Sequence, residues 1–375
     1  MIECSDIVGQ DEAVARIQRA MSQSRMPHAY LFAGPDGVGR RTTAIALART
    51  LLCPQPVSVA AGRSFRQACG KCPDCRMVEA GSHPDFHPVY KELAAYHDDS
   101  EVRDRVMQSL SIGVIQQFLI DAVGRSSTRG RGKVFVVEEA ELMTHEAQNA
   151  LLKTLEEPPP GVTIILICEK PEELLPTTLS RCSLVRFSLL PREFVAGKLA
   201  EAGVAADEAR FWAAFTQGSV GRAMALSGAG MYEVKREVLS RLAGLPPAGD
   251  VELGEQLAER SDKLAETAVA ASRKAEGPTL AKTLASRQSA GTMLELIASA
   301  YRDALALRTG AELEIIHADQ RRQLDSLATR FTPEQLAGII ESLSECERLL
   351  WRNVNPRIVW DNAVLACASG TALRV

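Results

Sequence analysis

The chain has 375 residues, enough for two or three domains, and its 43 basic and 47 acidic side chains give a net charge of −4, which excludes a polycation that coats nucleic acid along its whole length. Its longest apolar run, residues 162–168, is far too short to span a bilayer, and residues 1–11 lack the apolar segment of a secretory signal. We therefore expect a cytosolic (cytoplasmic) protein without membrane contact, whose nine cysteines are thiols or metal ligands and not disulfides.

The N-terminal part predicts a site of the kind that binds nucleotides. An amphipathic helix is expected within residues 6–24, followed by a short strand at 29–33, a glycine-rich turn at 34–42 and a helix at 43–52. Gly34 and Gly39 have the G-x-x-x-x-G spacing of a phosphate-binding loop. Such a loop directs backbone amides and a helix N-terminus toward phosphates.

The two positions after this loop differ from the usual pattern, because Arg40 and Arg41 stand where lysine and serine or threonine are expected. A guanidinium is bulkier than an ammonium, and Arg41 offers no oxygen to Mg²⁺. We expect a degenerate nucleotide site that does not hydrolyse ATP, while weak binding of a nucleotide or phosphate stays open. Its candidate residues in this segment are Gly34, Gly37, Gly39, Arg40, Arg41 and Thr42.

Four cysteines, Cys53, Cys69, Cys72 and Cys75, form two overlapping C-x-x-C pairs and one upstream ligand. Four thiolates match a closed tetrahedral zinc site and leave no position for a catalytic water. A structural zinc is therefore favoured over a redox dithiol or free thiols, and the spacing after Cys75 disfavours an iron–sulfur cluster. His83 is an alternative ligand that fits better in the turn at 82–85. The remaining cysteines, Cys4, Cys168, Cys182, Cys346 and Cys367, are expected to pack as small apolar residues.

A helix is predicted over residues 110–123, followed by a loop at 125–133 with four basic side chains. We expect this loop to be a solvated turn, with a DNA or phosphate contact as the alternative. A strand at 134–137 then leads to Glu138 and Glu139. Carboxylates at that place hold Mg²⁺ and orient the attacking water in nucleotide hydrolases. With Arg40 and Arg41 nearby, ion pairs are expected here in place of a metal site.

The segment 148–182 is predicted to form a helix, a proline-rich turn, a buried strand at 162–167 and a second, short helix. The prolines at 158–160 end the first helix, since proline has no amide to donate. The β-branched run that follows suits a strand buried on both faces. Arg181 lies at the end of the short helix, and we interpret it as a guanidinium that serves a phosphate on another subunit.

Residues beyond 190 are predicted to be helical, with a linker at 244–249. Thr332 and Gln335 form a capping box with Pro333 at the first helical position, and Asn355-Pro356 begins the last helix.

Together, residues 28–40, the four-cysteine insertion, residues 134–159 and residues 178–182 resemble bacterial clamp-loader AAA+ subunits over about the first 225 residues. The resemblance implies an α/β AAA+ core with a parallel sheet and flanking helices at 1–190, carrying the zinc insertion at about 53–75. It further implies a helical lid at 191–245 and an all-α collar at 246–375, through which subunits associate.

The resemblance also implies roles for particular residues. Ser180, Arg181 and Cys182 correspond to the SRC motif, whose arginine reaches the γ-phosphate held by a neighbouring gamma subunit. Such an arginine is worth ~10³–10⁵ in rate in well-studied hydrolases. Arg222 corresponds to the sensor 2 arginine and, with Glu138 and Glu139, completes the degenerate nucleotide site.

The family has a hydrolysing gamma/tau branch, from which Arg40-Arg41 and Cys168-Glu169 depart. These departures indicate a non-hydrolysing subunit of a hetero-oligomer with gamma/tau and delta subunits, which loads the sliding clamp on primed DNA. Two alternatives stay open: an active gamma/tau-type ATPase, and a zinc-containing adaptor with no role in ATP hydrolysis.

Overall fold

The computed structural model describes residues 7–23, 25–61, 63–103, 109–247, 249–274, 282–352 and 354–370. Cys4 lies outside these residues. The chain divides into two compact units, Met1–Pro191 and Arg192–Val375. The boundary between a lid and a collar within the second unit stays a prediction.

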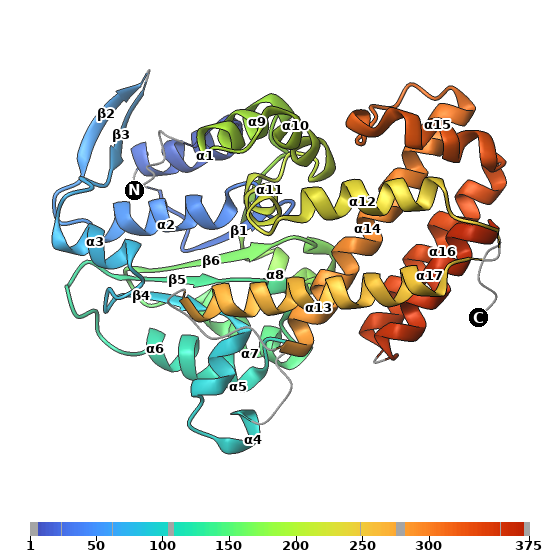
Figure 1. Cartoon of the computed structure of the whole chain (residues 1–375). Helices are drawn as coiled ribbons and strands as arrows, with labels where there is room; N and C mark the ends of the chain where they lie inside the picture. The colour runs from blue at the N-terminus through green and yellow to red at the C-terminus, as the bar shows by residue number, and fades with distance from the viewer. Residues whose placement is uncertain are drawn as a thin grey trace. The chain divides into compact units, whose positions relative to one another are not determined.

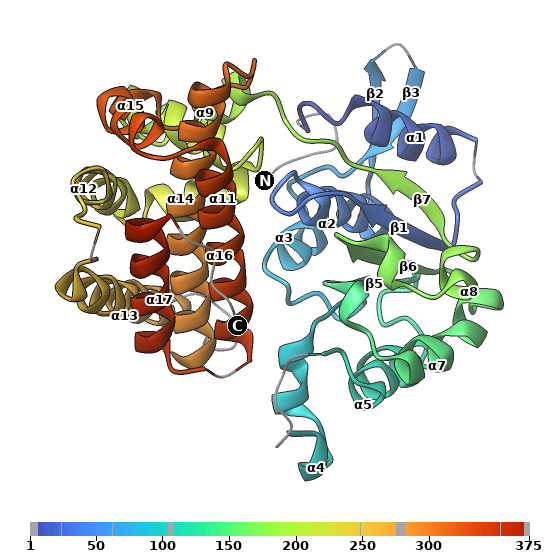
Figure 2. The ribbon, with the colours of Figure 1, turned by 90° about the vertical axis from the view of Figure 1, so that its right-hand side faces the viewer.

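A parallel five-stranded sheet forms the centre of the first unit, with the strand order β4-β5-β6-β1-β7. Figure 1 labels β4, β5, β6 and β1, and Figure 2 labels β7 beside β1. Its strands are β1 (Ala29–Ala33), β4 (Phe86–Val89), β5 (Lys133–Val137), β6 (Val162–Cys168) and β7 (Ser183–Arg186). Strand β1 pairs with β6 on one side and β7 on the other. The segments that follow these three strands are far apart in the sequence but lie near one another at the carboxyl end of β1. All five residues of β1 are buried, as expected for a parallel strand covered on both faces.

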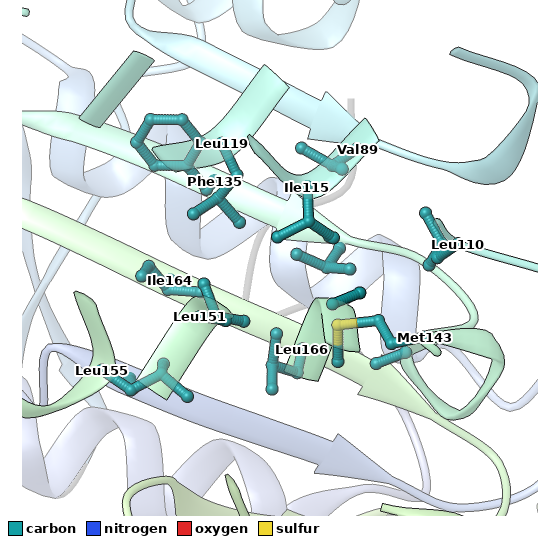
Figure 3. Close-up of a cluster of buried hydrophobic side chains, with 14 of the residues drawn as sticks. Val89, Leu110, Ile115, Leu119, Phe135, Met143, Leu151, Leu155, Ile164 and Leu166 are labelled. Atoms are coloured by element: carbon teal, nitrogen blue, oxygen red, sulfur yellow. The ribbon is translucent and has the colours of Figure 1, made fainter. Parts of the chain in front are cut away.

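Helices cover both faces of this sheet (Figures 1 and 2). One side has α1 (Asp11–Ser22), α2 (Arg40–Leu52) and α3 (Pro73–Glu79); the other has α5 (Ile112–Ile115), α6 (Asp121–Val123) and α7 (His145–Glu156), with α8 (Pro176–Leu179) beside α7. Successive residues of β1 point to opposite faces: Phe32 packs with Ile17 and Leu47, while Leu31 packs with Leu151 and its neighbours. Figure 3 shows the second of these cores, between the sheet and α5 and α7.

The first unit also contains elements that the sequence patterns did not predict. A hairpin of β2 (Val57–Ala61) and β3 (Arg63–Gln67) lies within the cysteine insertion. The helix expected at 110–123 begins only at Ile112, with Ser111 as its N-cap, and Gln116–Ile120 is π-helical between α5 and α6. The remaining elements are α4 (Ser100–Arg103) and 3-10 turns at Lys91–Tyr96, Ala140–Leu142 and Pro171–Glu173.

The second unit is helical wherever its regular structure is described. Its helices are α9 (Arg192–Glu201), α10 (Ala206–Phe215), α11 (Val220–Ser227), α12 (Met231–Ala243), α13 (Val251–Lys274), α14 (Lys282–Thr309), α15 (Arg321–Arg330), α16 (Pro333–Trp351) and α17 (Pro356–Ser369), with a 3-10 turn at Ala318–Gln320. Helix α14 packs against α13, α15 and α16. The predicted capping box of Thr332 and Gln335 is present. Among the described residues, no helix has the length and apolarity needed to cross a membrane.

Candidate functional site

The glycine-rich loop connects the end of β1 to the start of α2. Gly37 and Gly39 have φ of 70° and 100°, a backbone conformation that favours glycine. A Cβ built on Gly34 would lie 2.3 Å from the carbonyl oxygen of Phe187, so the loop passes too close to the end of β7 for any other residue. The predicted loop is therefore formed, with its backbone turned at the N-terminus of α2.

The charged side chains around this loop neutralise one another. Arg41 Nε donates to Glu138 Oε1 at 2.6 Å, and Lys91 Nζ donates to both carboxylate oxygens of Glu139 at 2.7 and 2.6 Å. Arg40, of which 7% is exposed, has a longer contact of 3.5 Å with Asp36. The ion pair expected between Arg41 and Glu138 is thus present, whereas Glu139 pairs with Lys91, which was not predicted, and Arg40 contacts Asp36 in place of a glutamate. Thr42 is half-buried in the first turn of α2.

One residue of this region, Gln10, had no predicted role. It is 4% exposed, and its Nε2 donates to the carbonyl oxygens of Val38 and Ser188 at 3.2 and 2.6 Å. Its Oε1 accepts from the Ser188 amide at 2.9 Å. Gln10 therefore ties the glycine-rich loop to the segment after β7, 178 residues away. The sequence marks Gln10 only by its place after Val8 and Gly9, directly before α1, and this place does not identify its distant partners.

The four predicted metal ligands come together at one point. Cys53 follows the last residue of α2, Cys72 caps α3, Cys75 lies in α3, and Cys69 precedes them both. Their sulfur atoms all lie within 4.8 Å of one another, with Cys53–Cys72 and Cys69–Cys75 distances of 4.0 and 3.9 Å. Four thiolates about 2.3 Å from a tetrahedral zinc are about 3.8 Å apart. The cluster could therefore hold a metal ion such as zinc.

The thiols of this cluster have different environments. Hydrogen bonds from the backbone amides of Lys71 and Cys72 lower the pKa of Cys69 to about 6. Burial raises the pKa of Cys53 and Cys75. His83 does not join the cluster, because its Nε2 contacts Asp74 Oδ1 at 3.2 Å and its Nδ1 accepts from the Asp85 amide at 3.0 Å.

The basic loop at 125–133 is folded around the carboxylate of Asp85. This carboxylate accepts from the amides of Thr128 and Arg129, both at 2.7 Å, and these bonds lower the pKa of Asp85 against the opposing effect of burial. Arg125, Arg129 and Arg131 are exposed, as expected for a solvated turn. For Lys133 that expectation was wrong: as the first residue of β5 it is 5% exposed and donates to the Ala122 carbonyl at 2.6 Å.

Arg181 follows Ser180, the C-cap of α8, and α8 packs against α7. Gln148 of α7 is fully buried; its Oε1 accepts from the Leu175 amide at 2.8 Å and from the Thr178 hydroxyl at 3.4 Å, and its Nε2 donates to the Met143 carbonyl at 3.2 Å. These bonds fix the direction in which α8 leaves the sheet. The Arg181 side chain is 30% exposed, and its Nε donates to Glu156 Oε1 at 2.7 Å.

The residues on either side of Arg181, Ser180 and Cys182, contact the helix and the core beside it. The Ser180 hydroxyl donates to the Thr177 carbonyl at 3.1 Å and accepts from Arg181 Nη1 at 3.3 Å. Cys182 packs against the core below α7, and burial raises the pKa of its thiol to about 12. Its contact with the core agrees with the expectation that Cys182 packs as a small apolar residue.

Arg222 belongs to the second unit, in α11. Its Nη1 donates to Glu295 Oε1 of α14 at 3.1 Å, its Nη2 donates to Glu295 Oε2, and its guanidinium lies 5.4 Å from the centre of the Phe215 ring. These contacts join α11 to α14 within the same unit. The nucleotide-loop residues, the cysteines and the segment 180–182 all belong to the first unit.

A parallel sheet of this order, with a glycine-rich loop after its first strand and a helical region after it, defines a protein of the AAA+ type. The family model described as "DNA polymerase III, delta subunit" matches residues 9–191, and the one described as "DNA polymerase III, delta subunit, C terminal" matches residues 254–367. The chain belongs to the DNA polymerase III delta-prime subunit family.

The chain is also similar to individual proteins. The chain is 26% identical to DNA polymerase III subunit delta' of Bacillus subtilis over 96% of its own length and 97% of the relative. It is 40% identical to the Pseudomonas aeruginosa subunit delta' over 155 residues, 41% of each chain. It is 34% identical to subunit tau of Escherichia coli over 178 residues, which are 48% of this chain but only 24% of that relative. A solved gamma subunit-related protein from Thermotoga maritima covers 96% of the chain at 16% identity with a TM-score of 0.38.

Proposed function

We propose that the chain acts as a non-hydrolysing subunit of the clamp loader and supplies Arg181 to the ATP site of an adjacent gamma/tau subunit. The complex, which also contains delta, loads the sliding clamp onto primed DNA. The guanidinium is placed against the charge that develops on the transferred phosphoryl group, where such a residue in trans accelerates hydrolysis by ~10³–10⁵. The chain itself braces the assembly, in the cytoplasm, through its second unit.

One contrast within the first unit carries the proposal. Glu138 and Glu139, at the positions for magnesium and water, are occupied by Arg41 and Lys91 of the same chain. Arg181 also makes an ion pair, with Glu156, but no element of a nucleotide loop surrounds it among the described residues: it lies after a short helix that a buried amide holds in place, and its side chain stays 30% exposed. A chain with a blocked site of its own and a braced, accessible arginine is suited to complete the site of a neighbour.

The four cysteines are proposed to hold a structural zinc. The closed set of four thiolates leaves no open coordination position, and Zn²⁺ would stabilise the junction between the end of α2 and α3. The role of the ion is confined to folding. This chain does not hydrolyse ATP with magnesium.

ATP turnover tests the proposal. The pure chain is measured first, then a mixture with gamma and delta subunits containing either wild type, Arg181→Ala or the control Arg186→Ala, an exposed arginine of β7. We expect only background turnover for the pure chain. In the mixture, Arg181→Ala should still assemble but lose efficient DNA-dependent turnover, whereas Arg186→Ala should behave as wild type. Rapid turnover by the pure chain would favour the gamma/tau-type ATPase. Equal turnover with Arg181→Ala and wild type would favour the zinc-containing adaptor.

A further inference from the structure

Helix α8 is attached to α7 at two places that differ in burial. At one, Gln148 is fully buried and holds the start of α8 through the Leu175 amide and the Thr178 hydroxyl. At the other, Glu156, the last residue of α7, binds the guanidinium of Arg181 at the surface. The buried attachment is shielded from water, so opening it would leave buried polar groups without partners. The surface attachment can open without unfolding, because water replaces its hydrogen bonds.

The guanidinium of Arg181 is almost fully engaged within its own chain. An arginine has five N–H donors. Nε and Nη2 both donate to Glu156 Oε1, and Nη1 donates to the Thr177 carbonyl at 2.8 Å and to the Ser180 hydroxyl at 3.3 Å. These contacts account for four donors and leave one. A bidentate contact with a phosphate requires two parallel N–H groups, so the observed contacts must open first.

We propose that Glu156 is a positioning residue that holds Arg181 against its own chain. When the phosphate of a neighbouring subunit binds the guanidinium, it displaces the Glu156 carboxylate. The inference rests on the proposed function of Arg181. The carboxylate and the phosphate compete for the same Nε–Nη2 edge of the guanidinium. The side chains of Arg181 and Glu156 are 30% and 47% exposed, so the pair is screened by solvent and weak enough to yield to a more highly charged phosphate. Glu156 thereby limits how often the arginine is available for the transfer.

Two charge-neutral variants test this role in the complete mixture with gamma and delta subunits. Glu156→Gln removes the competing charge, and Glu157→Gln removes the same charge one residue later; in the described part of the chain, Glu157 has no hydrogen bond with Arg181. At subsaturating ATP we expect turnover to rise about two- to fivefold with Glu156→Gln, which corresponds to about 0.4–1 kcal/mol, the value of an exposed ion pair. Turnover with Glu157→Gln should match wild type.

Two further measurements separate this role from a structural one. The gain with Glu156→Gln should shrink as ionic strength is raised, because salt screens an exposed pair. The gain should also be absent when Glu156→Gln is combined with Arg181→Ala. Melting curves of each variant identify any loss of folding. A loss of folding would lower turnover, so it could not produce the expected gain.

The outcomes are distinguishable. If Arg181→Ala leaves turnover unchanged, the proposed function fails and this inference with it. If Arg181→Ala lowers turnover but Glu156→Gln equals Glu157→Gln, the role of Glu156 is overturned and the proposed function stands. A fall with Glu156→Gln toward the Arg181→Ala level would mean that the carboxylate orients the guanidinium productively, which also overturns the inference.

Discussion

Arg41 Nε lies 2.6 Å from Glu138 Oε1, so a side chain of the glycine-rich loop is bound to the first acidic residue after β5. In a hydrolysing site of this fold, a magnesium ion lies between the corresponding positions. Here the cation is a guanidinium that belongs to the chain itself. The arginine side chain is 63% exposed, and so the pair contributes little to stability. We propose that its consequence is chemical, because the guanidinium takes the place that a metal ion would have beside Glu138.

Restoring the usual residues should therefore restore nucleotide affinity. The double variant Arg40→Lys with Arg41→Thr removes two bulky guanidinium groups and supplies a hydroxyl for Mg²⁺. We expect it to bind a fluorescent ATP analogue with magnesium at least about tenfold more tightly than wild type, or about 1.4 kcal/mol. Glu138→Gln alone is the control: it breaks the ion pair but keeps both guanidinium groups and adds no hydroxyl for Mg²⁺, so it should bind as weakly as wild type. Equal affinity of wild type and double variant would contradict the prediction.

Metal content is the most direct test of the cysteine cluster. Elemental analysis of the purified chain should find about one zinc per chain, and Cys72→Ser should lose it because three thiolates bind less tightly than four. Chelation should lower the melting temperature of wild type, since binding of a structural metal contributes to folding. Cys346→Ser changes a buried cysteine of α16 and should keep the metal. Full metal content in Cys72→Ser would exclude this coordination.

The buried amide of Gln148 gives a stability prediction. Gln148→Leu keeps the approximate volume but leaves the Leu175 amide and the Met143 carbonyl without their side-chain partner. An unsatisfied buried polar group costs about 1–3 kcal/mol. We expect a lower denaturant midpoint and lower turnover in the assembled mixture, because α8 loses its support. Asn149→Leu, an exposed amide one residue later on α7, is the control. Equal midpoints for the two variants would rule out the bracing role.

Local patterns in the sequence were enough for much of this fold. The apolar, β-branched run at 162–168 identified a central parallel strand, the glycine spacing identified the loop after β1, and the cysteine spacing identified a cluster that the structure brings within 4.8 Å. Each of these features depends on residues close together in the chain. Periodicity and spacing therefore carry the information directly.

The residues that hold the site together were not predictable in this way. Gln10 bonds to Ser188, Gln148 to Leu175, and Glu156 to Arg181, over separations of 178, 27 and 25 residues. Which glutamine or glutamate faces such a partner depends on how the strands and helices pack, and no local period encodes it. Lys133 was misassigned to a solvated loop for a related reason: its burial follows from the register of β5 beside β6.

In the second unit, a buried histidine predicts a dependence of stability on pH. His317 is 1% exposed; its Nε2 is 2.8 Å from the Ser299 hydroxyl, and its amide donates to Asp303 Oδ2 at 2.8 Å. Burial, with further contributions from Lys235 and Arg302, lowers the pKa of His317 well below its usual value. The ring is therefore neutral in the folded chain and gains a proton when the chain unfolds in mildly acidic solution.

The sign of the effect follows from this difference. The unfolded chain binds the proton below a pKa of about 6.5, so the contribution of His317 to stability is fully present above that pH and is lost as the pH falls toward the lowered folded value. Between pH 7.5 and 5.5 the loss should be about 1.4 kcal/mol. The comparison stops at pH 5.5 because burial raises the pKa of Asp303, whose protonation acts in the opposite direction.

Denaturant midpoints at the two pH values test this expectation. His317→Gln removes the titrating ring, and although it lowers stability at pH 7.5, it should show a smaller further loss at pH 5.5 than wild type does. His145→Gln removes an exposed histidine at the start of α7 and should keep the wild-type dependence. An identical dependence in His317→Gln and wild type would mean that the ring is already protonated in the folded chain. Its charge would then have to be stabilised by Asp303 or Asp319 in spite of Lys235, whose ammonium binds Asp319 at 2.6 Å.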